Sequence, residues 1–406
     1  MKDSLAVGAE RPTSLRFPRN VTMLGWVSFL NDASSEMIYP LLPIFLTQVL
    51  KASRLFVGTV EGIAETTASL LKLFSGWFSD RMRVRKGLVG AGYGLAALAR
   101  PLIAAAQAPW HILLLRFLDR VGKGIRTSPR DALIADSTPE ALRGRAFGFQ
   151  RAMDHGGAMV GPLLASGLLL LWPERYRLVF ALAAVPAMVS LLVLFSGVQE
   201  IPPMRGEKAP PPRWTLAPFD LPFRLFLLVV LLFTLGNSSD AFLLLRAREL
   251  GIASRRLPLL WVALHLVKSF TSTPGGRLSD RWGRRPVIVL GWAVYALVYL
   301  GFGFARAAWQ GWALFLVYGL YFGLTEGTEK ALVADWVPSE LRGTAYGLYH
   351  LIIGLGMLPA SVLFGWLYQV WGAKVAFGFG ALLAALASAG LLALRMPKVR
   401  VGEGQG

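Results

Sequence analysis

The feature that most constrains this chain is a series of apolar runs, each about twenty residues long, which recur from one end of the sequence to the other. A helical run of that length matches the apolar thickness of a lipid bilayer. Hydrophobic residues make up 54% of the 406 residues and charged residues only 16%. The mean hydropathy is +0.51. The sequence therefore predicts an all-α integral membrane protein.

The apolar runs predict twelve transmembrane helices in two bundles of six. One proline-rich stretch, residues 199–214, interrupts the series, because a segment of that composition neither spans a bilayer nor continues a helix. The expected parts are an N-terminal tail at 1–20, a first bundle at 21–197, a linker at 198–220, a second bundle at 221–395 and a C-terminal tail at 396–406. The expected helices are 21–46, 56–79, 87–107, 110–132, 146–171, 178–197, 221–245, 257–279, 286–305, 311–334, 345–370 and 374–395.

The distribution of basic residues predicts the orientation in the membrane. The net charge of +18 is also compatible with nucleic-acid binding, but such proteins concentrate their bases on a soluble domain, and the sequence offers none. Bases cluster instead in the connections near 81–86, 143–145, 205–213 and 281–285. By the positive-inside rule these connections face the cytoplasm. We expect a multi-pass protein of the inner or plasma membrane with both termini cytoplasmic, and no nucleic-acid partner.

The two halves of the chain repeat each other. "ALIADSTPEALRGRAFGF", from Ala132, aligns without a gap with "ALVADWVPSELRGTAYGL", from Ala331. "SSE" ending at Glu36 likewise corresponds to "SSD" ending at Asp240. A duplicated six-helix unit places a binding site between the halves near the bilayer midplane, where one bundle rocks against the other. Alternating access is the mechanism that this arrangement predicts.

At this point the chain resembles the major facilitator superfamily, over nearly its whole length. The family's loop signature, Gly-x3-Asp-Arg-x-Gly-Arg-Arg/Lys, is complete in the second half, whereas the first half has Arg83 in place of the second glycine. An acid at a helix end and bases on the next segment form a charge clamp that closes in one state and opens in the other. Ordinary positive-inside anchoring is the alternative role. The candidate gating residues are Asp80, Arg81, Arg85, Asp280, Arg281, Arg284 and Arg285.

A second signature is similar to the motif of the superfamily's drug/proton antiporters. Gly148, Gly157, Gly161 and Pro162 match it, although Ala165 and the following serine stand where that group has two further glycines. The resemblance implies export, because close helix contacts at glycines and a proline kink seal one side of the path. Glycine and proline are also common in membrane helices for packing alone.

Two acids lie within the first apolar run, at Asp32 and Glu36. They are four residues apart and so share one face of a helix. A charge at bilayer depth costs about 2.5 to 3.5 kcal/mol, so both acids must face the protein interior, paired or protonated. "EMIYP" at Glu36 is similar to the first-helix motif of the multidrug facilitator group, where the acid takes part in protonation and substrate binding. Glu36 is therefore the predicted main proton site and Asp32 its helper, with a structural salt bridge as the alternative.

Further charges crowd the predicted helices of the first half. The additional candidates for proton coupling are Glu61, Glu65 and Asp154, although a structural network of Glu65 with Lys72 is an equally good interpretation. The density of bases in the fourth predicted helix indicates a cavity that receives a carboxylate or a phosphate, unless those bases reach lipid headgroups. The candidate substrate-binding residues are Asn31, Arg116, Arg120, Lys123, Arg126 and Asp240. In the second half, Glu326 and Lys330 are spaced for an ion pair within one helix.

The sequence predicts a transporter and not an enzyme. It lacks cysteine, a phosphate-binding loop, a hydrolase serine motif and a histidine pair with metal-ligand spacing, so we expect no cofactor and no metal. The prediction is a monomeric, proton-coupled exporter of small amphipathic or anionic organic molecules, such as drugs, metabolites or siderophore-like compounds. A proton-coupled importer of a small organic anion is the alternative, and an enzyme or sensor on a transporter scaffold is a more distant one.

Overall fold

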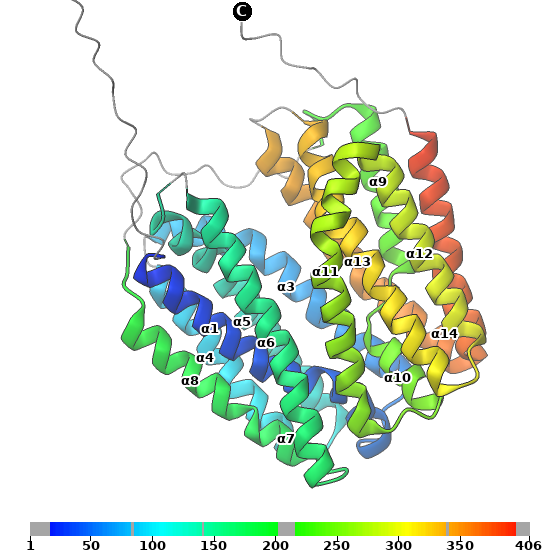
Figure 1. Cartoon of the computed structure of the whole chain (residues 1–406), viewed down its shortest axis with the longest axis horizontal. Helices are drawn as coiled ribbons and strands as arrows, with labels where there is room; N and C mark the ends of the chain where they lie inside the picture. The colour runs from blue at the N-terminus through cyan, green and yellow to red at the C-terminus, as the bar shows by residue number, and fades with distance from the viewer. Residues whose placement is uncertain (1–16, 83–84, 140–141, 202–215, 338–340, 395–406) are drawn as a thin grey trace, which may run out of the picture.

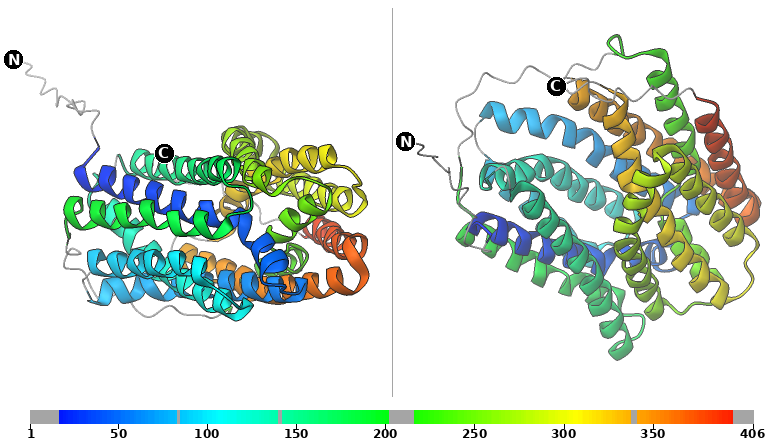
Figure 2. Two further views of the ribbon diagram at one scale, coloured as in Figure 1. Left: turned by 90° about the horizontal axis from the view of Figure 1, so that it is seen from below. Right: turned by 45° about the horizontal axis from the view of Figure 1, so that its top comes forward.

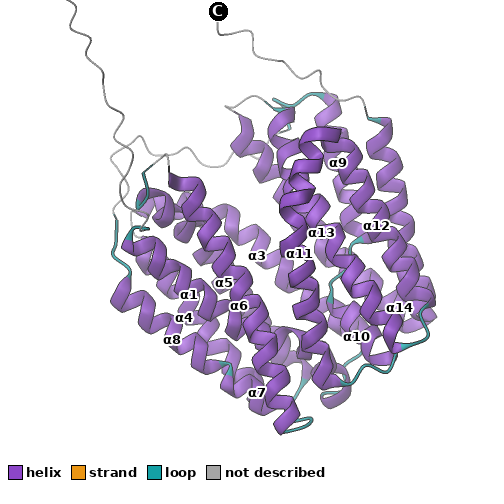
Figure 3. Ribbon diagram, in the orientation of Figure 1, coloured by secondary structure: helices purple, strands orange, loops and turns teal. Residues whose placement is uncertain are grey.

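The structure is a computed structural model that describes residues 17–82, 85–139, 142–201, 216–337 and 341–394. Within these residues all regular structure is helical (Figure 3). The predicted linker and both predicted tails fall largely outside the described residues. The all-α prediction is confirmed.

The helices of the first half follow the predicted apolar runs. The first run is helical throughout but changes character after its prolines: α1 spans Arg19–Ile38, and short segments continue it at Tyr39–Leu41, Leu42–Ile44 and Phe45–Val49. Proline lacks the N–H that an α-helix requires, so Pro40 and Pro43 account for this change. The other helices are α3 Arg54–Met82, α4 Arg85–Leu102, α5 Pro109–Asp136, α6 Arg143–Leu171, α7 Tyr176–Leu182 and α8 Ala184–Gly197.

The second half differs from the prediction at one point. The span expected at 221–245 is broken at residues 237–240, which separate α9 from α10. The last two predicted spans both lie in α14, which turns sharply between them at Gly372, where φ is 81° and only glycine is unstrained. The helices are α9 Leu221–Gly236, α10 Ala241–Glu249, α11 Leu257–Trp282, α12 Arg284–Phe304, α13 Ala308–Trp336 and α14 Arg342–Ala393.

Figure 1 shows two groups of helices that meet at one end and diverge at the other. Helices α1, α4, α5, α6 and α8 form one group, and α9 and α11 to α14 form the other. Helix α3 packs on α5 of its own group and on α14 of the other group. The groups converge near α7 and α10, and they spread apart toward the start of α9, as the views in Figure 2 also show.

The outer surface is apolar, as a protein embedded in lipid requires. Large side chains such as Leu98, Leu192, Leu297 and Phe270 are at least two-thirds exposed on the helix surfaces. Six helical segments in the described part of the chain are long and apolar enough to cross a bilayer by themselves. Helices α3 and α5 carry charged side chains, and several of these point into the protein, as described below. The chain is a membrane protein.

Candidate functional site: a charged cavity between the two halves

A cavity of about 340 Å³ lies between the two groups of helices. Both groups contribute to its wall, and the wall combines aromatic side chains with acids and bases. Pockets of this size, with a few converging polar groups, are typical of small-molecule sites. The lining includes Glu36, Tyr39, Glu65, Arg120, Lys123, residues 237–240, Trp261, His265, Lys268, Tyr318, Phe322, Met357 and Ser361.

Glu36 connects the two halves within this cavity. The indole N–H of Trp261, on α11, donates a hydrogen bond to Glu36 Oε2 at 2.8 Å. The ring of Tyr39, one turn beyond Glu36, lies 5.0 Å from the Trp261 ring, centroid to centroid. Asp32 lies one turn before Glu36 and accepts a hydrogen bond from the Asn31 amide at 2.9 Å. Neither Asp32 nor Asn31 is among the residues that line the cavity.

Beside the cavity, α1, α3, α4 and α5 share a buried charge network. Arg116 donates to both carboxylate oxygens of Glu61, at 3.0 and 2.9 Å, and lies 3.7 Å from Asp119. Arg100 pairs with Asp119 at 3.0 Å and donates to both the backbone carbonyl and the side-chain oxygen of Asn31. All five side chains are nearly inaccessible to solvent. The network fixes the helices relative to one another, because a buried charge is stable only when paired.

Arg100 was not predicted from the sequence. The signal was present, because a single arginine inside an apolar span must find an acid or a carbonyl within the protein. Arg116 and Asn31, both predicted to bind substrate, belong to this network and do not line the cavity.

The candidates on α3 and α5 that line the cavity differ in whether they have an ion-pair partner. Glu65 pairs with Arg120 at 3.2 Å, and both line the cavity. The adjacent helix α5 thus supplies the ion-pair partner of Glu65, and Lys72 of the same helix contributes a further positive charge nearby. Lys123, one turn beyond Arg120, also lines the cavity and has no ion-pair partner among the residues that the structure describes.

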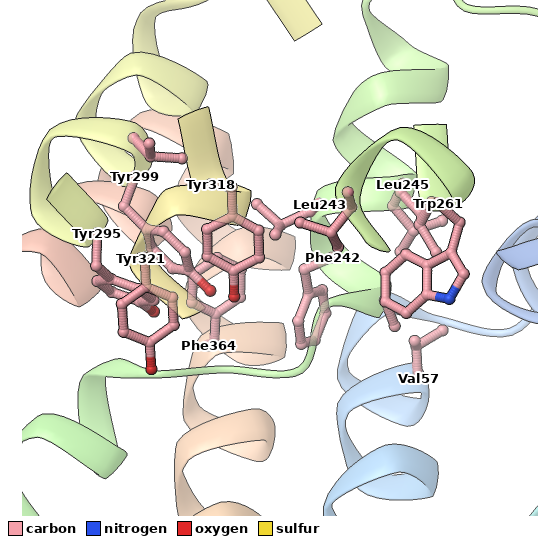
Figure 4. Packing of buried hydrophobic residues seen from close by; sticks show 14 of the residues in the cluster. Val57, Phe242, Leu243, Leu245, Trp261, Tyr295, Tyr299, Tyr318, Tyr321 and Phe364 are labelled. Carbon is pink, nitrogen blue, oxygen red and sulfur yellow. The ribbon is translucent and has the colours of Figure 1, made fainter. Parts of the chain in front are cut away.

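On the opposite wall, the break between α9 and α10 exposes polar groups to the cavity. Residues 237–240 are not helical and all line it. Tyr318 donates a hydrogen bond to Asp240 Oδ1 at 2.7 Å, and Tyr295 donates to the Gly236 carbonyl at 2.9 Å. The Tyr299 hydroxyl lies 3.2 Å from that of Ser238. Figure 4 shows how these tyrosines gather from α12 and α13. Non-helical backbone at membrane depth is tolerated where protein or a cavity satisfies it.

Two further acids of the second half, Glu326 and Glu329, contact side chains of neighbouring helices. Glu326 pairs with Lys268 of α11 at 2.8 Å, so the predicted pair with Lys330 on its own helix was wrong. Glu329 accepts hydrogen bonds from the Trp292 indole at 2.8 Å and from the Tyr349 hydroxyl at 2.6 Å. In each case a side chain of a facing helix satisfies the acid.

The glycines of the antiporter-like motif lie against α1. A Cβ atom at Gly157 would lie 2.3 Å from the carbonyl oxygen of Phe29, and one at Gly161 would lie 2.3 Å from that of Ala33. Gly148 has open space around it. Two of the three glycines are therefore required for α6 to approach the helix that carries Asp32 and Glu36, and Pro162 follows directly within α6.

Two other predicted residues lie away from the cavity lining. Asp154 accepts a hydrogen bond from Gln150 at 3.0 Å and lies 3.8 Å from Arg130. Arg126 is buried with its guanidinium 4.6 Å from the centre of the Tyr93 ring. Their roles in proton coupling and substrate binding stay predictions.

Each half has ion pairs between helices at the position of its predicted charge clamp, at the end where the two groups diverge. Arg284 contacts Asp280 at 2.5 Å and Asp335 of α13 at 3.1 Å. Arg85 forms an ion pair with Asp136 of α5 in the first half. The remaining bases of this set, Arg281 and Arg285, lie at the same end, while the side chains of Asp80 and Arg81 are outside the described residues.

Asp136 and Asp335 were not predicted to take part in the clamps. Both stand at the same place in the repeated "ALIAD" and "ALVAD" segments, which was a usable signal.

At the other end of the molecule, polar contacts tie the two halves together. Arg54 of α3 pairs with Glu249 of α10 at 2.6 Å and stacks over the ring of Tyr368. Tyr368 in turn donates to Glu249 at 2.7 Å, and the Gln369 side chain accepts from the backbone of Leu55 at 3.3 Å. These contacts hold the two groups of helices together at the end where they converge. None of these residues was singled out from the sequence.

Comparison with known proteins assigns the family. The sequence model of the Major Facilitator Superfamily matches residues 24–247 and 225–405, and the chain belongs to this superfamily of membrane transporters. It is 36% identical over 384 residues to an uncharacterized MFS-type transporter of Methanocaldococcus jannaschii, covering 93% of this chain and 94% of that protein.

More distant relatives extend the comparison. Multidrug resistance protein MdtG of Citrobacter koseri is 23% identical over 377 residues, covering 89% of this chain and 91% of that protein. Among solved structures, the nucleoside transporter NupG superposes with a TM-score of 0.78 at 13% identity, covering 92% of this chain and 99% of that one. The major facilitator fold predicted from the sequence is confirmed, and so is the resemblance to the multidrug facilitator group.

Proposed function

We propose that this chain is a proton-coupled exporter of small amphipathic or anionic organic molecules, working by alternating access. Both termini and the linker face the cytoplasm in this proposal, as the distribution of bases predicts. The end at which the helix groups diverge is then the cytoplasmic end. Export is supported by the fit of Gly157 and Gly161 against α1.

The position of Glu36 is the observation that carries the proposal. Its carboxylate lines the cavity and accepts the Trp261 indole N–H from the other half. A change in the charge of Glu36 therefore alters a contact between the two halves and the electrostatic field in the cavity together. This is what coupling requires: a proton and a substrate must each bias the same two-state equilibrium.

The proposal is tested by proton release from inside-out membrane vesicles with an acidic interior and a pH-reporting dye. A panel of cationic, neutral, zwitterionic and anionic compounds is added to the wild type and to Glu36→Gln. We expect at least one compound to release protons in the wild type and none to do so in Glu36→Gln. Equal proton release by the two proteins contradicts the role of Glu36, and a signal only with the gradient reversed favours the importer.

A further inference from the structure

The charged groups of the cavity wall do not all compensate one another. Three acids, Glu36, Glu65 and Asp240, face it together with the bases Arg120, Lys123 and Lys268. Glu65 is paired with Arg120, and Lys268 is paired with Glu326. Glu36, Lys123 and Asp240 are left without an ion-pair partner among the described residues.

The proposed function assigns Glu36 to the proton, so the next step rests on that function. Lys123 and Asp240 then remain, one cation and one anion. Lys123 belongs to α5 in the first half, and Asp240 lies at the break between α9 and α10 in the second half. The hydrogen bond to Asp240 comes from the neutral Tyr318 hydroxyl at 2.7 Å. The wall of the first half therefore has one cation without an ion-pair partner among the described residues, and the wall of the second half has one such anion.

From this arrangement we infer that the cavity selects small zwitterions, with a carboxylate directed to Lys123 and an ammonium group directed to Asp240. An anion alone would leave Asp240 facing the ligand without a counter-charge, and a cation alone would do the same for Lys123. Each charge that the ligand covers without providing a counter-charge loses hydration and penalises binding. A zwitterion satisfies both walls and adds no net charge to the cavity.

The remainder of the lining fits the body of such a molecule. Trp261, Leu264, Phe322 and Met357 provide apolar surface between the charged groups. The volume of about 340 Å³ is near the lower end of ligand sites. The expected ligands are thus compact, with an aromatic or aliphatic body that carries one carboxylate and one amine.

The break at residues 237–240 holds Asp240 in place for this role. Asp240 lies between the last turn of α9, which ends at Gly236, and the first turn of α10, which begins at Ala241. Tyr318, Tyr295 and Tyr299 hold this non-helical segment in position.

Binding to the purified full-length protein in lipid nanodiscs tests the inference. The probes are the L-amino acids, their N-acetyl derivatives, which are anions, and their amides, which are cations. These three series share side chains and differ only in charge. The readout is thermal stabilisation as a function of probe concentration. We expect at least one amino acid to bind tenfold or more tightly than both of its derivatives.

Substitutions at Lys123 and at Asp240 test the two sides of the cavity independently. Lys123→Gln should abolish the preference for the amino acid over its amide, whereas Lys123→Arg should retain it. Asp240→Asn should abolish the preference over the N-acetyl derivative. Lys374→Gln, a lysine on α14 whose ammonium group lies over the Phe304 ring away from the cavity, is the matched control and should leave both preferences unchanged.

The inference is overturned if either derivative binds as tightly as its parent, or if no amino acid stabilises the protein. It is also overturned if Lys123→Gln and Asp240→Asn keep the wild-type preferences. Its failure is distinguishable from that of the proposed function, because the binding assay involves no proton gradient. Proton release by a compound that is not a zwitterion would refute the inference and leave the proposed function intact.

Discussion

The two halves of this transporter carry matching sequence segments, yet they hold their helices together by different chemistry. The first half buries ion pairs, with Arg100, Arg116 and Asp119 at the centre of the network. The second half buries a cluster of tyrosines and tryptophan that donate hydrogen bonds to acids and carbonyls. The repeated acids reflect this difference, since Glu36 lies on a continuous helix and bonds across the halves, whereas Asp240 lies at a helix break and bonds within its own half.

The comparison teaches that the two halves contribute differently to transport. Removing one member of a buried ion-pair network costs much stability, because its partner is left as an unpaired buried charge. Removing one hydroxyl from a hydrogen-bonded aromatic cluster costs less stability. We therefore expect a rigid first half that carries the proton site and a more adaptable second half that adjusts around the substrate.

The largest expected effect follows from breaking the network of the first half. Arg116→Ala leaves the Glu61 carboxylate buried without its partner, and we expect a loss of about 3 to 5 kcal/mol of stability. Thermal unfolding of the detergent-purified protein measures it. If Arg116→Ala unfolds at the wild-type temperature, the contrast between the halves is not one of buried charge.

A smaller effect is expected at Gly157 and at Gly356, which occupies the equivalent position in the second half, 199 residues later. A Cβ atom at Gly157 would lie 2.3 Å from the backbone oxygen of Phe29. A Cβ atom at Gly356 would lie 2.8 Å from a methyl group of Thr234. We expect Gly157→Ala to cost about 1 to 3 kcal/mol and Gly356→Ala less, because backbone yields less readily than a side chain.

The control for this comparison is Gly148→Ala, since Gly148 has open space around it. Thermal unfolding and transport are measured for all three variants. Equal losses of stability in Gly157→Ala and Gly148→Ala would show that the close contact of α6 with α1 does not set the cost of a side chain at Gly157.

A third prediction sharpens the comparison in the second half. Tyr318→Phe removes the hydroxyl that donates to Asp240, and we expect a loss of about 0.6 to 1.7 kcal/mol, well below that of Arg116→Ala. Thermal unfolding again provides the measurement. A loss as large as that of Arg116→Ala would mean that the tyrosine cluster is as rigid as the charge network.

The smallest effect is expected at the contact between the halves near α10. Arg54→Gln removes an ion pair with Glu249 that is partly exposed, which is worth about 0.2 to 1 kcal/mol. This loss shifts the balance of conformations a few-fold toward opening at that end. The chain contains no cysteine, so the rate of maleimide labelling at Ile44→Cys, a buried position that lines a pocket beside Arg54, reports the opening. Unchanged labelling would show that the pair does not hold this end closed.

The fold could be predicted from the sequence because apolar runs and an internal repeat are properties of the chain itself. Of the candidates for proton coupling and substrate binding, the structure places Glu36, Glu65, Arg120, Lys123 and Asp240 around one cavity. Their roles in proton coupling and substrate binding stay predictions.

The partners of the buried charges were less predictable, because they depend on which helices face each other. Spacing along one helix favoured Lys330 as the ion-pair partner of Glu326, but α11 places Lys268 2.8 Å from that carboxylate. The Trp261 contact was not predicted, since a tryptophan in an apolar span gives no signal of its partner. The helix break at residues 237–240 had a signal, the polar "NSSD" within an apolar run, that was interpreted only as a repeat.

The central claim is that Glu36 carries the proton and Asp240 binds the substrate. Substrate exchange in proteoliposomes tests this claim most directly. The compound that releases protons with the wild type is followed in two modes: exchange of labelled for unlabelled substrate without a gradient, and accumulation driven by a proton gradient. We predict that Glu36→Gln keeps exchange and loses proton-driven accumulation, whereas Asp240→Asn loses both. Proton-driven accumulation by Glu36→Gln at the wild-type level would contradict the account.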